Sequence, residues 1–460
     1  MRSKGFYLRS DCILGFSFLI IGLTAPFSLV PIKVQYICGL MGFAIIFWLF
    51  QPIKLEKTSF LLIAGFLFTE LTDFEDVLLT FSSDTPWLII AGMAISISLI
   101  ESKIANLFAL NIANLLSKSI IGLVLQMHLL GLLTAIIVPS GLVRVIILFP
   151  LGKAIAAQYG EHQKFELQKV ILLSLTLSTV VGGFGILTGA VPNMIAAGLY
   201  TGVTNIPVTW SNWLLWMFPS ASLFRVITSA MVISIIYSGK FGVLKKNGNL
   251  KKTKFDRKQY WIMAIITGFV VGLFTDSIHN YSPLQVCLLT ILAIFSRPIG
   301  PLPIKSIIKV NFGFLFYVVA LFALGDAIET SGLVYYYKSF VVEIFDSTDF
   351  SLPLRYFVTA LSPVPLSLFM DVAAVAALLV PIFVELAPSI GLEPYSTMMA
   401  LSLGTSIVFL PYQAAPLMLA YSSGDLPKDI FLKILGMVSF VSAFLLYPGA
   451  IVYWLVLGLV

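Results

Sequence analysis

The chain has 460 residues, of which 59% are apolar and only 11% are charged, and its formal net charge is +6. A soluble domain carries roughly a quarter of charged residues, so this composition excludes an ordinary soluble domain, and the clustered basic residues indicate membrane topology rather than nucleic-acid binding. Apolar windows of about 17 residues or more recur along the chain, which predicts an all-α polytopic membrane protein with about 11 transmembrane helices and not a β-barrel.

The N-terminal part begins with a basic segment that contains Arg2, Lys4 and Arg9. The acidic and turn-rich stretch 71–85 is interpreted as an exposed or interfacial loop. Helices and shorter apolar pieces are expected around it, in chain order, at 12–30, 34–50, 58–70, 86–101 and, as an amphipathic piece, at 103–117.

The segment 120–157 is interrupted by Pro139-Ser140-Gly141 and is then too short for two ordinary spans. We therefore expect two half-length helices that meet at this turn as a re-entrant hairpin. A helix at 167–187 runs into a Gly-rich break, and a short helix follows to 202, with another span at 211–237. Backbone groups at such breaks are tolerated in a membrane only where they face protein or a water-filled cavity, and breaks of this kind are typical of transporter sites.

The loop 240–258 is basic and lies near the middle of the chain. The positive-inside rule predicts that it is cytoplasmic, and we expect the N-terminus on the same side. The second half follows the order of the first, with spans at 259–276, 283–296 and 311–329, an amphipathic piece at 333–346, a Pro-broken segment at 351–389, a helix at 395–410 that breaks at 410–416, and a last span at 430–458.

The spacing of two prolines supports an internal repeat. Pro150 lies ten residues after Ser140, and Pro381 lies ten residues after Asp371. Paired, Pro- or Gly-interrupted segments at matching places in two halves indicate the binding site of a transporter. We therefore predict an inverted-repeat transporter composed of N-terminal helices 1–57, a first repeat 58–239 with hairpin 120–157, a basic linker 240–258, and a second repeat 259–460 with hairpin 351–389.

The stretch from Gly182 to Asn193 reads G-G-F-G-I-L-T-G-A-V-P-N. It resembles the Gly-Gly…Thr…Gly…Pro-Pro-Asn motif of the divalent anion–sodium symporter family, the dicarboxylate, citrate and sulfate carriers. The sequence after Asp371 and the E-T-S-G-L from Glu329 are also similar, and the resemblance covers 58–458. It implies two re-entrant hairpins, a homodimer, and transport of anions by an elevator-type movement.

The hairpin tips depart from this family. Family members carry Ser-Asn-Thr at each tip, which holds a sodium ion and a substrate carboxylate. Here the matching segments are Ser140-Gly141-Leu142 and Asp371-Val372-Ala373. Because only Ser140 is kept, the resemblance implies the scaffold of the site more strongly than its sodium ligands.

Two charged residues are predicted inside the membrane, where a charge is costly and usually faces a cavity or a partner. Arg144 is interpreted as a fixed cation for an anionic substrate, replacing the charge of a sodium ion, or as the ion-pair partner of Asp371. Asp371 is interpreted as a site for a coupling proton, a ligand for a cation, or the neutralising partner of Arg144.

The remaining candidate site residues are polar groups and backbone positions at the two breaks. Ser140, Asp371 and Gly189 are predicted to contribute to ion coupling. The predicted substrate-binding residues are Ser140, Gly141, Arg144, Thr188, Pro192, Asn193, Gln413 and Pro416. The alternative for the first break is that its glycines only permit close helix packing, and the alternative for Gln413 is a structural cap.

These observations predict a secondary active transporter of a small anion, with a dicarboxylate as the first choice, in the bacterial inner membrane. Sodium is a candidate coupling ion beside protons or anion exchange, and no other cofactor is expected. A cation/proton antiporter that uses Asp371 is the closest alternative. A membrane-embedded enzyme or assembly factor is the alternative of another class, and it lacks a visible cluster of catalytic side chains.

Overall fold

The computed structural model describes residues 10–24, 30–50, 52–104, 115–244, 254–296, 300–333, 335, 342–343, 345 and 350–460. Within these ranges the chain is almost entirely helical, and seven helices are long and apolar enough to cross a membrane, with three shorter apolar helices beside them. The predicted helical membrane fold is confirmed. The amphipathic pieces predicted at 103–117 and 333–346 and the middle of the loop 240–258 lie largely outside the described residues.

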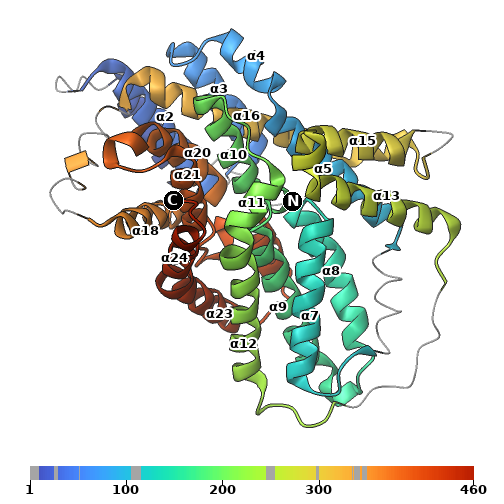
Figure 1. Cartoon of the computed structure of the whole chain (residues 1–460). Coiled ribbons are helices and arrows are strands. Elements are labelled where there is room, and N and C mark those ends of the chain that lie inside the picture. The colour runs from blue at the N-terminus through green and yellow to red at the C-terminus, as the bar shows by residue number, and fades with distance from the viewer. Residues whose placement is uncertain are drawn as a thin grey trace, which may run out of the picture.

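The chain begins with five helices, α1 (Ser10–Thr24), α2 (Ile32–Phe50), α3 (Leu55–Phe68), α4 (Phe74–Ser82) and α5 (Asp84–Glu101). Of these, α1 packs on α2 and α2 packs on α3, while α5 lies beside α15 (Pro283–Phe295) (Figure 1). The presence of α4 corrects the interpretation of 71–85 as a loop. Glu75 and Asp76 lie in its first turn, where acidic side chains stabilise the positive end of the helix dipole.

The first half continues with a helical hairpin, a broken helix and a long helix. The hairpin consists of α7 (Ile120–Ile137) and α8 (Gly141–Ala156), which both pack against α9 (Glu161–Gly183). Figure 1 shows the two arms of this hairpin side by side, with their turn toward the middle of the molecule. The chain then forms η2 (Leu187–Gly189), α10 (Val191–Thr204), α11 (Trp210–Met217), the π-helical segment η3 (Phe218–Phe224) and α12 (Arg225–Tyr237).

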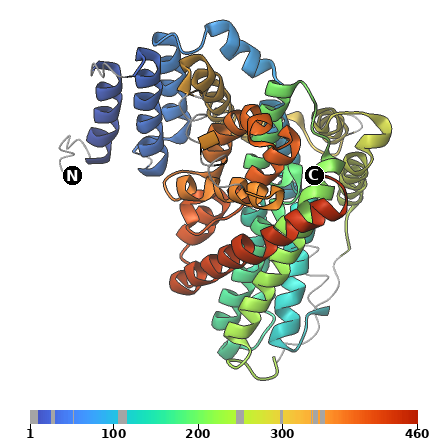
Figure 2. The same ribbon diagram turned by 60° about the vertical axis from the view of Figure 1, so that its left-hand side comes forward.

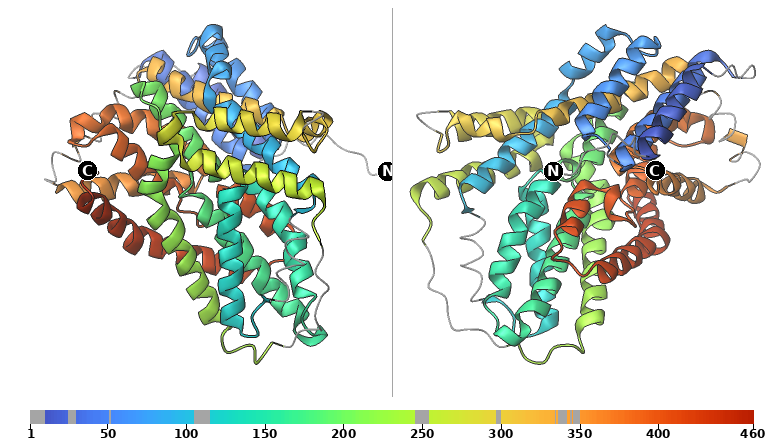
Figure 3. Two further views of the ribbon diagram at one scale, coloured as in Figure 1. Left: turned by 45° about the vertical axis from the view of Figure 1, so that its right-hand side comes forward. Right: turned by 180° about the vertical axis from the view of Figure 1, so that it is seen from behind.

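The second half first adds α13 (Arg257–Phe274), α14 (Asp276–His279), α15 (Pro283–Phe295), η4 (Ile304–Lys309) and α16 (Gly313–Ser331). Figure 3 shows α13 and α15 side by side along one edge of the molecule, where they contact each other. The chain then forms α18 (Leu352–Leu361), α19 (Pro363–Ser367), α20 (Val372–Leu386), η5 (Ala387–Ile390), α21 (Pro394–Thr405), η6 (Pro411–Gln413), α22 (Ala415–Ser422), α23 (Lys428–Val441), the π-helical segment η7 (Ser442–Leu446) and α24 (Tyr447–Val456).

The two halves therefore repeat the same order of elements. A hairpin (α7–α8, then α18–α20) is followed by a broken helix (α9–α10, then α21–α22) and by a long helix with a π-helical segment in its middle (α11–α12, then α23–α24). The two π-helical segments contact each other where these long helices cross, and Figure 2 shows the C-terminal helix in red running across the green helix of the first half. Helices α10 and α20 pack together and join the halves in the core.

Candidate functional site

Four helices begin at one cavity of about 460 Å³, which we call the central cavity. Its lining includes the first residues of α8 and α20, which follow the hairpin tips, and of α10 and α22, which follow the helix breaks. A helix N-terminus presents unpaired backbone N–H groups and the positive end of the helix dipole. The four ends together make the cavity favourable for negatively charged oxygen atoms.

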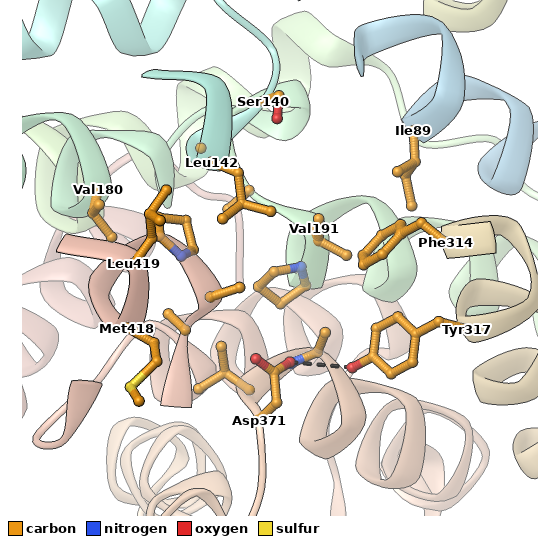
Figure 4. Close-up of a pocket in the computed structure, with 18 of the residues that line it drawn as sticks. Ile89, Ser140, Leu142, Val180, Val191, Phe314, Tyr317, Asp371, Met418 and Leu419 are labelled. Atoms are coloured by element: carbon orange, nitrogen blue, oxygen red, sulfur yellow. Dashed lines mark hydrogen bonds between the residues drawn. The ribbon is translucent and has the colours of Figure 1, made fainter. Parts of the chain in front are cut away.

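The two hairpin tips meet the cavity with one polar side chain each, Ser140 and Asp371. Ser140 is the N-cap of α8, where its Oγ accepts a hydrogen bond from Val143 N at 3.5 Å. Asp371 is the N-cap of α20, where its Oδ1 accepts from Ala373 N at 2.8 Å. Figure 4 shows these side chains at opposite ends of the lining that it draws. The repeat thus places a neutral cap in one half and a carboxylate cap in the other.

Tyr317 of α16 reaches the second tip from outside the hairpin. Its hydroxyl donates to Asp371 Oδ1 at 3.3 Å, as the dashed line in Figure 4 shows. The carboxylate therefore has its hydrogen bonds from the protein itself. Among the described residues, no group of three His, Cys, Asp or Glu is placed to hold a metal ion.

The side chain of Asn193 hydrogen-bonds to the backbone of the first break, residues 184–190, on the side away from the central cavity. Its side-chain amide nitrogen donates to the carbonyl oxygens of Gly183, Phe184 and Ile186 at 3.3, 3.0 and 2.8 Å. These carbonyls lie at the C-terminal end of α9, where the regular i→i−4 hydrogen bonds stop; Gly183 O and Ile186 O also accept from Ile186 N and Gly189 N. Asn193 is buried, so its amide replaces the water that would otherwise bind them.

The second break, residues 406–414, is held in a similar way by Gln413. Its Oε1 accepts from Phe409 N and Leu410 N at 2.7 and 2.6 Å, and its Nε2 donates to the carbonyl oxygen of Ser367 at 2.6 Å. Gln413 thereby joins the second break to Ser367, which lies before the tip of the second hairpin. These contacts are those of a structural cap, which was the alternative interpretation of Gln413.

Arg144 lies in the first turn of α8, is 2% exposed, and contacts carbonyl oxygens rather than an acid. Its Nη1 donates to Val138 O at 2.9 Å and its Nη2 donates to Gly189 O at 2.7 Å. The guanidinium joins the end of α7 to the first break, and it also lines the central cavity. Its Nε has no hydrogen-bond partner among the described residues. The structure shows no ion pair between Arg144 and Asp371, which was the alternative considered from the sequence.

The close approach at this break requires glycine. A Cβ on Gly183 would lie 2.5 Å from Arg144 Nη2 and 2.7 Å from Gly189 O, and one on Gly189 would lie 2.5 Å from Gly183 O. A side chain at Gly183 would push the guanidinium away from the carbonyls that it binds, and one at Gly189 would separate the two ends of the break. The glycines therefore do more here than permit helix packing.

The structure separates the sequence-predicted site residues into two groups. Ser140, Gly141, Arg144, Gly189, Pro192, Asp371 and Pro416 line the central cavity. Thr188, Asn193 and Gln413 are buried behind the lining, where Thr188 Oγ1 accepts from Trp210 Nε1 at 3.2 Å. These three residues shape the breaks and do not reach the cavity.

Arg225 is the residue that the sequence reasoning missed. It is 1% exposed, and it links the two halves: its Nε donates to Ser442 Oγ at 2.9 Å and its Nη2 donates to Ser406 O at 2.8 Å. Its guanidinium also lies 5.6 Å from the ring centroid of Phe184 in the first break. An arginine within a predicted span is the signal that could have found it, because such a charge needs a partner.

Serines of the two long helices hold the breaks as well. Ser222 of η3 donates to Gly182 O and accepts from Gly185 N, and Ser439 of α23 donates to Val408 O. Each long helix thus supports the broken helix of its own half, while Arg225 crosses to the other half. Side chains of neighbouring helices therefore hydrogen-bond to the backbone of both breaks.

The family-level comparison agrees with this architecture. A family model described as the sodium:sulfate symporter transmembrane region matches residues 10–460. The chain belongs to this family. The resemblance to the divalent anion–sodium symporters predicted from the Gly182–Asn193 motif is thereby confirmed, and the chain is a transporter rather than an enzyme.

Relatives of this symporter-family chain match over most of their length. It is 23% identical over 433 residues to an uncharacterized transporter of Haemophilus influenzae, with 91% of each chain covered. It is 20% identical over 452 residues to a membrane protein of Cupriavidus necator, with 92% of this chain and 88% of the other covered. Its fold is similar to the crystal structure of the Alcanivorax borkumensis YdaH transporter, which has an unusual topology (TM-score 0.57, 13% identity, 83% and 88% coverage).

Proposed function

We propose that this protein is a secondary active transporter that carries a small organic anion, a dicarboxylate or a related carboxylate, through the central cavity. The observation that carries the proposal is the convergence of four helix N-termini on that cavity. Helix N-termini bind carboxylate oxygens through backbone N–H groups. Substrate is thus held at the hairpin tips, where the two repeats meet.

Arg144 supports anion binding in two ways in this proposal. It places a fixed positive charge in the wall of the cavity, and it positions the first break by binding Val138 O and Gly189 O. Transport then follows an elevator-type alternation in a homodimer, in which the hairpins and broken helices move with the substrate. Both features are expected from the family and are part of the proposal.

Three coupling modes fit the proposal: a sodium ion, a proton on Asp371, or exchange of a second anion. Unwound carbonyl oxygens are the ligands that sodium uses at helix breaks. The guanidinium of Arg144 already binds one of them at the first break, Gly189 O, and another at the end of α7, Val138 O. We therefore propose that any coupling sodium binds at the second break or the second hairpin tip. We favour a proton on Asp371 or exchange of a second anion over a sodium ion at the first break.

A ligand screen on the purified protein tests this function. Thermal stability is measured with mono-, di- and tricarboxylates, sulfate and phosphate, each with sodium or with a large organic cation in its place. A ligand at about 100 times its Kd stabilises the native state by about 2.7 kcal/mol. Stabilisation by a carboxylate supports the proposal, and the absence of a shift with every anion, with or without sodium, contradicts it.

A cation/proton antiporter is the second candidate, because an acid, Asp371, lines the cavity beside Tyr317. In that case sodium or another cation alone stabilises the protein, and Asp371→Asn removes the effect. The anion transporter requires that an anion produces the stabilisation. The same screen therefore decides between the two functions.

We also propose that the N-terminus and the loop 240–258 face the cytoplasm of a bacterial inner membrane, because basic residues remain on that side. A cysteine introduced at Lys240, in a background without the three native cysteines, tests this topology. Labelling by a membrane-impermeant maleimide only after the cells are opened supports the proposed side. Labelling of intact spheroplasts contradicts it.

A further inference from the structure

We propose that the carboxylate of Asp371 occupies the anion-binding end of α20, so that the transported substrate is a monocarboxylate with an apolar body. The inference rests on the proposed function and narrows its substrate class. It replaces the dicarboxylate expected from the sequence by a singly charged, amphipathic carboxylate.

The first step concerns the unequal hairpin tips. At the tip of the first hairpin the N-cap of α8 is the neutral Ser140, and the adjoining N-terminus of α10 begins with Val191 and Pro192, so that these ends are open to a substrate carboxylate. At the second tip Asp371 Oδ1 accepts from Ala373 N at 2.8 Å and from the Tyr317 hydroxyl at 3.3 Å. The second tip thus already carries the negative group that a helix N-terminus would otherwise bind.

The second step concerns the charge that remains in the cavity. Any second carboxylate of a substrate would lie in the same cavity of about 460 Å³ as Asp371. At roughly 7 Å and an effective dielectric constant of about 20, two negative charges repel enough to weaken binding on the order of fiftyfold. One carboxylate at the first tip avoids this repulsion, because Ser140 and Asp371 lie at opposite ends of the lining (Figure 4).

The third step concerns the walls between the tips. Large apolar side chains dominate there, including Trp48, Met93, Phe314, Met418 and Leu419. The hydroxyl of Tyr412 donates to Leu368 O, so it is not a free donor for a substrate. Pockets of this size lined mainly by apolar groups, with few polar groups, bind ligands whose apolar surface they can bury.

One buried donor at the first tip supports a single-carboxylate ligand on that side. Arg144 Nε is buried and has no hydrogen-bond partner among the described residues, and the residue lines the cavity within one turn of Ser140. Buried donors usually have a partner. The Arg144 guanidinium, which lines the cavity beside the open helix N-termini, adds a fixed positive charge that favours an anionic partner there.

Three ligands separate the parts of this proposal: hexanoate, adipate and acetate. Hexanoate has one carboxylate and an apolar chain, adipate has the same chain length with two carboxylates, and acetate lacks the apolar body. Apparent Kd values are measured on the full-length protein by calorimetric titration. For the wild type we expect hexanoate to bind at least tenfold tighter than either of the others.

Two substitutions test the part that Asp371 plays. Asp371→Ser copies the cap of the first tip, and Asp371→Asn keeps a cap without the charge. In either variant we expect the preference for hexanoate over adipate to fall at least tenfold. Asp326→Ser is the matched control, because Asp326 is an exposed acid of α16 that does not line the cavity, and it should leave the preference unchanged.

The inference is overturned if the wild type binds adipate as tightly as hexanoate, or if a folded Asp371 variant keeps the wild-type preference. The wild-type comparison decides the question even where both variants fail to fold. Binding and uptake of dicarboxylates in preference to hexanoate would leave the proposed function intact and refute only the inference. Binding of none of the anions in the wider screen would refute both.

Discussion

Asn193 and Gln413 hold the two helix breaks of this transporter with the same chemical group, a side-chain amide buried directly behind the break. Asn193 donates to three carbonyl oxygens of the first break, whereas Gln413 accepts from two backbone nitrogens of the second and donates to the second hairpin. Neither residue reaches the central cavity. A buried amide can satisfy several backbone groups at once, so both breaks keep their shape without exposing their polar groups to lipid.

Replacing the amide donor of Asn193 should destabilise the protein. In Asn193→Asp a carboxylate oxygen faces the carbonyls of Gly183, Phe184 and Ile186, so that Phe184 O loses its donor while Gly183 O and Ile186 O keep only backbone donors, Ile186 N and Gly189 N. Each buried group left unpaired costs about 1–3 kcal/mol, so we expect a clear fall in the melting temperature in detergent. Gln158→Glu is the control, since Gln158 donates to Ala154 O at an exposed site. A melting temperature for Asn193→Asp equal to that of the control would refute this role.

A methyl group at Gly183 should disturb the first break. Its Cβ would lie 2.7 Å from Gly189 O and 2.5 Å from Arg144 Nη2, and overpacking of this kind costs about 1–3 kcal/mol. Gly202→Ala is a matched change, because a Cβ on Gly202 in α10 meets no atom within 4 Å. Helix propensity predicts that this control gains up to about 1 kcal/mol. Equal melting temperatures of the two variants would contradict the close approach.

Arg225 should contribute to stability through its link between the halves. The single ammonium nitrogen of lysine cannot take the positions of both Nε and Nη2, which donate to Ser442 Oγ and Ser406 O, and hydrogen bonds to a charged group contribute about 1.5–3 kcal/mol. We expect Arg225→Lys to lose stability of this order, and Arg257→Lys, at an exposed position, to change it by less than about 0.5 kcal/mol.

A double-mutant cycle isolates the contact of Arg225 with Ser442. Ser442→Ala should destabilise the wild type more than it destabilises Arg225→Lys, with a coupling free energy of about 0.5–3 kcal/mol. Denaturation in a mild detergent, followed by tryptophan fluorescence, provides the measurement. Additive effects would show that Arg225 and Ser442 contribute to stability through other contacts.

Arg144→Ala should abolish anion uptake into proteoliposomes while the protein remains folded. The substitution removes the fixed charge from the cavity and leaves Val138 O and Gly189 O without their donor. Arg144→Lys restores the charge and should recover part of the uptake. Lys153 lies on the same helix as Arg144, and Lys153→Ala, which breaks a partly exposed ion pair with Asp425 at 2.8 Å, should transport like the wild type. Normal uptake by Arg144→Ala would exclude Arg144 from the anion site.

The sequence predicts the fold well, because composition, Pro and Gly interruptions and the equal Ser140–Pro150 and Asp371–Pro381 spacings are local features. The structure confirms the helical membrane architecture. The division of the chain at 57, 239 and 258 stays a prediction. The partners of Arg144 could not be predicted, because backbone carbonyls leave no trace in side-chain patterns. The pairing of Arg225 with Ser442 joins positions 217 residues apart, which a single sequence cannot reveal.

The sequence also could not predict which candidate residues line the cavity and which lie behind its lining. Asn193 follows the proline that lines the cavity, yet its side chain turns back toward the break. Helical direction decides this, since successive residues at a helix start point to different sides. The same effect places Gln413 behind the lining while Pro416 reaches it.

Uptake of radiolabelled carboxylates into proteoliposomes tests the central claim, that a small carboxylate passes through the central cavity. Wild-type protein should accumulate hexanoate or succinate in a saturable way that protein-free liposomes do not show. Gly141→Leu should remove that uptake, because even its Cβ would lie 2.8 Å from Pro416 across the cavity wall. Uptake by Gly141→Leu equal to the wild type, or no uptake by the wild type under sodium, proton or anion gradients, would contradict the account.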